Sequence, residues 1–220
     1  MYQEYSSYET TLSVYCDRSE LSAEPIPQEA AKISERILSD QYRIQCDPDG
    51  MSRFTYIVGR HGHAFCPALF LCDPETGLVF GEQRLFVLEF CGTTTFSNVT
   101  QRAEEYQLPI LFAYRKFLST KECERFCICF LLDRPAQTSA EAWAIRVLLR
   151  SIFPESEMSD VDLMKVYIGG NYSIFCNKSI PTITTEMLYE ASCKYQNQDH
   201  AGGLPMGHCR LDIERKGGFL

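Results

Sequence analysis

The sequence predicts an α+β fold in which a central sheet of mixed or antiparallel strands is flanked by helices. Two segments rich in Leu, Phe, Val, Ile and Cys, Gln83–Phe90 and Arg125–Leu132, have the composition of buried strands. Ser139–Phe153 places apolar residues at helical spacing and begins with residues that cap helices. The predicted elements follow one another in the mixed order β-β-β-α-β-β-α-β, which favours helices packed on one central sheet.

Local signals predict the elements of the first part of the chain. A polar arm, residues 1–23, contains one short strand, Leu12–Tyr15, and Pro27 then introduces a helix over Gln28–Leu38. Asp47–Gly50 is a turn signal, and the next apolar segment, Phe54–Val58, reads as a strand.

The remaining elements continue this alternation. Turns are expected at Asp73–Gly77 and after Leu132, and Pro109 separates a short helix from the strand that follows it. Besides the three segments that predict the fold, the expected elements are the strands Ala68–Cys72, Ile110–Tyr114, Val166–Ile168 and Ile174–Cys176 and the helices Asn98–Tyr106 and Thr184–Tyr195. Gly202–Leu220 is rich in Gly and is expected to be a frayed tail.

Composition and charge exclude several classes of protein. With 45% apolar and 23% charged residues in 220, the chain is neither disordered nor fibrous. Its longest apolar runs are far shorter than the roughly 18–20 residues of a membrane span, and its N-terminus lacks the pattern of a secretory signal, so we expect a cytoplasmic protein without a membrane partner. A net charge of −8 means that any contact with nucleic acid has to be local.

Eleven cysteines raise the question of zinc. Without a secretory signal they are expected to be reduced thiols. Cys123, Cys127 and Cys129 form one cluster and His61-x-His63-x2-Cys66 another, but neither has the spacing of a zinc finger. We interpret them as small buried apolar side chains and loop histidines, so zinc is not the expected cofactor.

The end of the predicted strand Gln83–Phe90 carries candidate chemistry. Glu89 and Cys91 stand two residues apart and therefore share one face of their strand. Two carboxylates at that spacing would clamp a divalent metal, but here the second position is a thiol. The alternative interpretation is that Glu89 is a single edge carboxylate paired with Arg84 or Arg125.

Two further segments could bring charges to the same place. Asp160 and Asp162 precede Lys165 and the pair Gly169-Gly170, and the loop Arg115–Thr120 offers two cations and two hydroxyl groups. Together they could supply a carboxylate and cations that bind phosphate. In the alternative interpretation, the aspartates are solvated turn residues and the glycine pair is a hairpin turn.

Four stretches between Phe65 and Gly170 form a recognisable pattern by their order and spacing: EQRLFVLEFCGTTT, AEEYQLPILFAYRKFLST, ERFCICFLLDRP and AEAWAIRVLLRSIFPESEMSDVDLMKVYIGG. This pattern resembles the primase-polymerase domains of the archaeo-eukaryotic primase superfamily, as found in replication proteins of bacterial plasmids, phages and integrative elements. The resemblance implies a primase-like core with an RRM-like sheet over residues 56–180. Residues 1–55 would then be an N-terminal arm and helix that pack on or precede this core, and residues 181–220 a C-terminal helix and flexible tail.

The resemblance also implies roles for individual residues. In such domains a strand ending in Asp-x-Asp and a later Asp hold two catalytic metal ions, Mg²⁺ or Mn²⁺. Carried over, Glu89 and Asp162 would be the catalytic carboxylates, and Glu89, Cys91 and Asp162 would stand at the metal-ligand positions. Ser119, Arg125 and Lys165 would contact the nucleotide phosphates.

The sequence departs from the family pattern at this site. Cys91 stands at the second Asp, Glu89 replaces the first, Cys127 occupies a position where an Arg is common, and residues 115–120 contain no His. A neutral thiol cannot replace a carboxylate as a ligand of Mg²⁺, so a large loss of rate is expected.

We therefore expect a primase-polymerase-like domain of a mobile-element replication protein that binds nucleotides and single-stranded DNA or primer-template. Its nucleotidyltransferase activity would be reduced or lost. Related domains are often fused to a helicase, which implies a separate replicative helicase as a partner here. The alternative is a cytosolic protein-interaction or host-directed protein of a mobile element, with or without zinc and without polymerase chemistry.

Overall fold

The computed structural model describes residues 11–38, 41–75, 77–157 and 162–199. A five-stranded sheet with the order β4-β5-β7-β6-β8 forms its centre, and a three-stranded sheet has the order β2-β1-β3. The strands are β1 (Thr11–Cys16), β2 (Gln41–Gln45), β3 (Phe65–Cys66), β4 (Ala68–Asp73), β5 (Gly77–Cys91), β6 (Phe112–Lys116), β7 (Arg125–Ala136) and β8 (Gly170–Cys176). All neighbouring strands pair antiparallel, so the predicted α+β class is confirmed with an antiparallel sheet.

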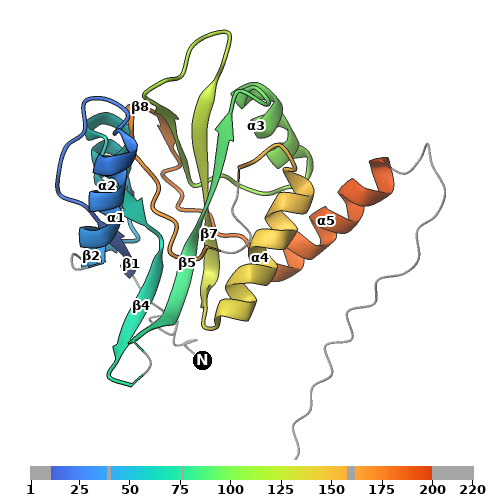
Figure 1. Ribbon diagram of the computed structural model, residues 1–220. Coiled ribbons are helices and arrows are strands. Elements are labelled where there is room, and N and C mark those ends of the chain that lie inside the picture. Colours follow the sequence, from blue (N-terminus) through green and yellow to red (C-terminus); the bar gives the residue numbers. More distant parts are fainter. Residues whose placement is uncertain (1–10, 39–40, 76, 158–161, 200–220) are drawn as a thin grey trace, which may run out of the picture.

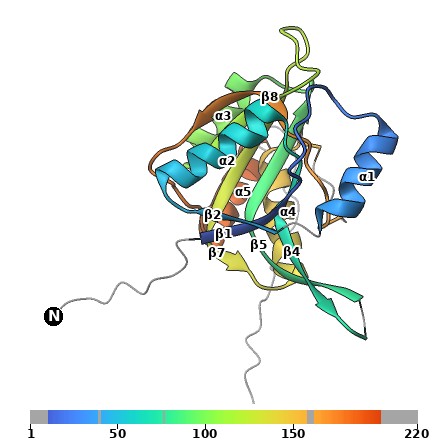
Figure 2. The same ribbon diagram turned by 90° about the vertical axis from the view of Figure 1, so that its left-hand side faces the viewer.

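Helices cover both faces of the five-stranded sheet (Figure 1). On one face lie α3 (Phe96–Glu105), α4 (Ser139–Ile152) and α5 (Thr185–Asp199). On the other lie α2 (Pro48–His61) and the three-stranded sheet, as Figure 2 shows. The remaining helix, α1 (Pro27–Ile37), packs through Ile33 and Ile37 where β3 meets β4.

The central strands are buried on both faces because the side chains of a strand alternate. On β5, Phe86, Leu88 and Phe90 pack with α3, α4 and α5. Leu85 and Val87 point the other way and pack with α2 and β1. We call these the α4 face and the α2 face of the sheet. This burial on both sides explains why β5 and β7 read as nearly continuous apolar runs.

The predicted helix over Ser139–Phe153 is confirmed as α4. The Thr138 side chain accepts a hydrogen bond from the Glu141 backbone, and the Glu141 carboxylate accepts one from Thr138, which forms a capping box. Among its buried side chains, Ala142, Ile145 and Leu149 repeat at helical spacing. The cap and the apolar stripe are both local signals, so the sequence located this helix to within a residue.

The predicted strand Phe54–Val58 is wrong, because these residues lie in the middle of α2. The preceding turn signal is the start of this helix: Asp47 caps it by accepting from the Gly50 backbone, and Pro48 occupies its first turn. Met51, Phe54 and Val58 are fully buried at helical spacing. Burial of this stripe outweighs the strand propensity of the aromatic and β-branched residues in FTYIV.

The expected strand Val166–Ile168 is also wrong, since Tyr167 forms only an isolated bridge with Phe65 and β8 begins at Gly170. The glycine pair lets two backbones approach closely and is not a hairpin turn. A Cβ on Gly169 would lie 2.4 Å from the Val58 carbonyl oxygen, and one on Gly170 would lie 1.8 Å from that of Arg115. The chain thus passes between α2 and β6 only because neither residue has a side chain.

Most other expected elements within the described residues are confirmed with shifts of a few residues at their ends. The strand expected at Gln83–Phe90 is longer and begins at Gly77, and the turn expected after Leu132 is wrong because β7 continues to Ala136. Asp160 and the expected tail Gly202–Leu220 lie outside the described residues. The proposed division at residue 55 falls inside α2, and the three-part organisation stays a prediction. In the described part of the chain, no helix is long and apolar enough to cross a membrane.

Candidate functional site

Glu89 is a buried carboxylate near the end of β5, with 8% of its surface exposed. The alternation along β5 places it on the α2 face, after Leu85 and Val87. Across the sheet it is paired with Cys127 of β7, which in turn is paired with Tyr114 of β6. A charge this well buried is destabilising unless it has a partner.

Two lysines satisfy this carboxylate. The Lys116 ammonium, at the end of β6, donates to Glu89 Oε1. The Lys165 ammonium lies 2.9 Å from Oε2 and also donates to the Glu157 carbonyl. Lys116 is itself 9% exposed, and its second carboxylate neighbour, Glu24, is 3.7 Å away. Both oxygens of Glu89 are therefore engaged by ammonium groups, and we call Glu89, Lys116 and Lys165 the Glu–Lys cluster.

The lysines decide the protonation state of Glu89. Burial is the largest single influence and raises the pKa of Glu89, but the charges and hydrogen bonds of Lys116 and Lys165 together hold that pKa below its usual value. For Lys116, burial lowers the pKa, and Glu89 more than reverses the effect, so the pKa is raised. At neutral pH the cluster is thus one carboxylate between two ammonium ions.

Cys91 follows on the same face and is paired with Arg125 across the sheet. Burial and the nearby carboxylates of Glu89 and Glu157 raise the pKa of the Cys91 thiol to about 11. It is therefore a neutral thiol at neutral pH. The thiolate is the form that binds metals, so this environment opposes metal binding by Cys91.

Ser119 links the two ends of the loop between β6 and β7 by hydrogen bonds. Its hydroxyl accepts a hydrogen bond from the Arg125 backbone at 2.9 Å, and its own N–H donates to the Lys116 carbonyl. This loop therefore places Ser119 and the half-buried Arg125 beside the Glu–Lys cluster. The structure thus brings together five of the six predicted site residues, Glu89, Cys91, Ser119, Arg125 and Lys165.

Asp162 forms the turn that precedes Lys165. Its side chain is exposed and accepts from the Met164 backbone at 2.8 Å, while its carbonyl oxygen accepts from Arg146. The turn that it forms delivers Lys165 to the cluster. The described part of the chain contains no group of three or more His, Cys, Asp or Glu side chains that could hold a metal ion. This finding applies to Glu89, Cys91 and Asp162 and also to the cysteine clusters.

Lys116 is the member of the cluster that sequence reasoning did not select. It belongs to the segment Arg115–Thr120, which the sequence predicts to be a loop with two cations and two hydroxyl groups, and the structure places it at the end of β6. The available signal was the alternation on β6, since Phe112, Tyr114 and Lys116 are all buried and share one face. The alternative interpretation paired Glu89 with Arg84 or Arg125, but its ion-pair partners in the structure are the two lysines. Arg84 instead donates to the carbonyls of Leu132 and Asp133.

Comparison with known proteins adds little. No family model matches the chain, and no curated protein matches it. Among solved structures, the polymerase domain of ligase D from Mycobacterium tuberculosis, in complex with DNA, is similar over 64% of this chain and 60% of its own length. The sequence identity is 15% and the TM-score 0.25, and we derive neither fold nor function from this likeness.

Proposed function

We propose that this protein is a primase-polymerase-like domain of a mobile-element replication protein that binds nucleotide or single-stranded nucleic acid without two-metal polymerase chemistry. The proposal rests on the resemblance of residues 65–170 to such domains, and the α+β fold on an antiparallel sheet is compatible with it. One observation carries the loss of chemistry: the carboxylate at the first metal position is held between two lysines.

The Glu–Lys cluster explains why metal catalysis would be lost. Two-metal catalysis needs carboxylate oxygens with lone pairs directed at the metal ions. Here each Glu89 oxygen accepts from an ammonium group, so a metal would first have to displace Lys116 or Lys165. Cys91 adds a neutral thiol rather than a second carboxylate. The two ammonium charges thus fill the electrostatic role that metal ions would have beside Glu89.

Binding would use the cations at the edge of this cluster. Lys165 and Arg125 are partly exposed, and Ser119 lies next to Arg125. Arg and Lys side chains are the usual partners of phosphate oxygens. Because the chain carries a net charge of −8, this contact would be local, and its affinity would fall with salt in proportion to the few phosphates that it engages.

Primer extension tests the loss of chemistry. We expect that neither the wild type nor Cys91→Asp extends a primer with Mg²⁺ or Mn²⁺, because both oxygens of Glu89 stay engaged in each protein. Metal-dependent extension by either protein, absent in Glu89→Gln, would overturn this part of the proposal. Cys91→Ala should bind nucleic acid as the wild type does, since no metal is held by the thiol.

Fluorescence anisotropy of a labelled oligothymidine tests the binding. Arg125→Ala should weaken binding and reduce the salt dependence of log K by about one phosphate contact. Lys194→Ala is the matched control, because it removes the same charge from the exposed side of α5. The same behaviour of both variants would mean that contact is non-specific. If the wild type binds neither the oligothymidine nor deoxynucleoside triphosphates at low salt, the proposed function is rejected.

A further inference from the structure

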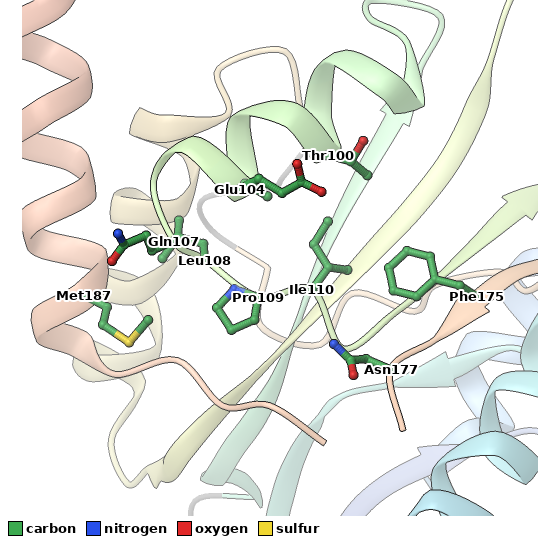
Figure 3. Close-up of a pocket in the computed structure, with 10 residues that line it drawn as sticks. Thr100, Glu104, Gln107, Leu108, Pro109, Ile110, Phe175, Asn177 and Met187 are labelled. Atoms are coloured by element: carbon green, nitrogen blue, oxygen red, sulfur yellow. The ribbon is translucent and has the colours of Figure 1, made fainter. Parts of the chain in front are cut away.

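A surface cleft of about 640 Å³ opens on the α4 face of the sheet. It lies between α3, the segment that joins α3 to β6, the end of β8 and the start of α5 (Figure 3). Its volume is within the range of about 300–1,000 Å³ found for ligand sites. Glu89 points to the opposite face, so this cleft is separate from the Glu–Lys cluster.

Apolar side chains form the floor of the cleft. Ala103, Leu108 and Ile110 belong to the buried core on this face, and Phe175 and Met187 pack against that core from β8 and α5. Methionine adapts its shape to different partners, and an aromatic ring offers a flat apolar surface. The floor is therefore suited to a bulky apolar group.

The rim of the cleft contains an unusual backbone position. Helix α3 ends in a Schellman motif, in which Leu108 N–H donates to the Ala103 carbonyl and Gln107 N–H to that of Glu104. The motif places Gln107 in the left-handed region with a φ of 56°, where glycine is the least strained residue. Glycine would make the same turn, but it would leave out the amide side chain that lines the cleft. A side chain at a backbone position that favours glycine, on the rim of a cleft, points to a role for that side chain.

The rim of the cleft carries a negative charge, which favours a ligand with a positive charge. Glu104 is the ionisable residue among the ten that line the cleft, and it lies in the last turn of α3. Both its carboxylate and the carboxyl end of a helix favour a positive charge. The Asn177 Oδ1 atom accepts from Ser179, so its amino group is the part that can donate to a ligand carbonyl.

We propose that this cleft binds a peptide segment of a partner protein in which a bulky apolar side chain stands next to Arg or Lys. The apolar side chain would occupy the floor between Ile110 and Phe175. The cation would pair with Glu104, and the amides of Gln107 and Asn177 would bind the peptide backbone. These contacts match the charge and polarity of each part of the cleft.

Titration of the ¹⁵N-labelled full chain with two capped dipeptides, N-acetyl-Phe-Arg-amide and N-acetyl-Phe-Glu-amide, tests the proposal. We expect the Phe-Arg peptide to shift the backbone amide resonances of Gln107, Ile110 and Asn177, and the Phe-Glu peptide to bind about tenfold more weakly or not at all. Equal binding of the two peptides, or shifts spread over other surfaces, would overturn the proposal.

Two matched variants keep the test specific. Glu104→Lys should weaken the Phe-Arg peptide about tenfold or more, whereas Glu105→Lys, which changes the net charge equally on the next residue, should leave it nearly unchanged. Equal effects of both would show that only the overall charge matters and would refute the role of Glu104. Gln107→Gly should fold at least as well as the wild type and still bind more weakly. None of these changes touches the Glu–Lys cluster, so their outcome is independent of the proposed function.

Discussion

Lys116→Met would remove one of the two charges that compensate Glu89 while keeping most of the aliphatic volume of the side chain. Glu89 lies on β5 and Lys116 at the end of β6, and β7 runs between these two strands, so the ion pair spans β7. Since Lys116 and Glu89 are 9% and 8% exposed, water cannot fully replace the lost ammonium group.

The expected cost follows from this geometry. Leaving a buried charge without any partner costs about 3–5 kcal/mol. Lys165 remains 2.9 Å from Glu89 Oε2, so the carboxylate keeps part of its compensation and we expect Lys116→Met to cost about 2–3 kcal/mol. Lys165→Met should cost about 1 kcal/mol, because its side chain is 21% exposed and water can take its place.

Urea unfolding of a double-mutant cycle measures this interaction. The four proteins are the wild type, Lys116→Met, Glu89→Leu and the double variant. We expect a coupling free energy of about 2 kcal/mol between positions 89 and 116, with the double variant more stable than Lys116→Met because two apolar residues replace a broken ion pair. Lys194→Met on α5 is a control for the loss of one surface charge.

A different result would refute the reasoning. If Lys116→Met unfolds within about 0.5 kcal/mol of the wild type, the ammonium group does not compensate a buried charge. If the two single changes add up in the double variant, Glu89 and Lys116 do not interact. Either outcome would also remove the main support for the loss of metal chemistry.

Three further predictions concern pH, backbone geometry and a helix cap. Because the folded-state pKa of Glu89 is lowered, its ionised form contributes stability above the unfolded-state pKa of about 4.3, and this contribution is lost as the pH falls through the folded-state value. The difference in the free energy of unfolding in urea between the wild type and Glu89→Gln should therefore shrink from neutral to acidic pH. A difference that stays constant would contradict this prediction. Gly170→Ala should cost more than about 2 kcal/mol of stability, because its Cβ would overlap the Arg115 carbonyl oxygen. Gly77→Ala should cost about 1 kcal/mol, because Gly77 has open space around it and only its φ of +85° is unfavourable for alanine. Similar melting temperatures for the two variants would argue against the close approach of backbones at Gly170. Asp47→Ala should destabilise α2 by about 1 kcal/mol and Asp47→Ser much less, which thermal unfolding by circular dichroism can compare; equal losses would mean that the side-chain cap is unimportant.

The candidate site was only partly predictable. Glu89, Cys91 and Lys165 are candidates from their positions at predicted strand ends and from the resemblance, and the structure does place them around one strand end. The metal-binding and phosphate-binding roles stay predictions. Lys116 could not be assigned as a partner because its contact with Glu89 depends on β6 and β5 both lying beside β7, an order that the sequence does not contain. The orientation of the Asp162 carboxylate depends likewise on the turn that carries Lys165.

By itself, the sequence determined α4 and the buried parts of β5 and β7, because apolar periodicity and helix caps act within a few residues and both faces of these strand segments are covered. Packing decided that Phe54–Val58 is a helix, since the buried stripe from Met51 to Val58 stabilises the helical form against the strand propensity of its residues. Packing also decided that Gly169 and Gly170 serve a close approach of backbones. The tertiary structure also decided the charge state of Glu89. Its pKa depends on burial and on Lys116 and Lys165, which come from segments distant in the sequence and meet Glu89 only in the folded protein.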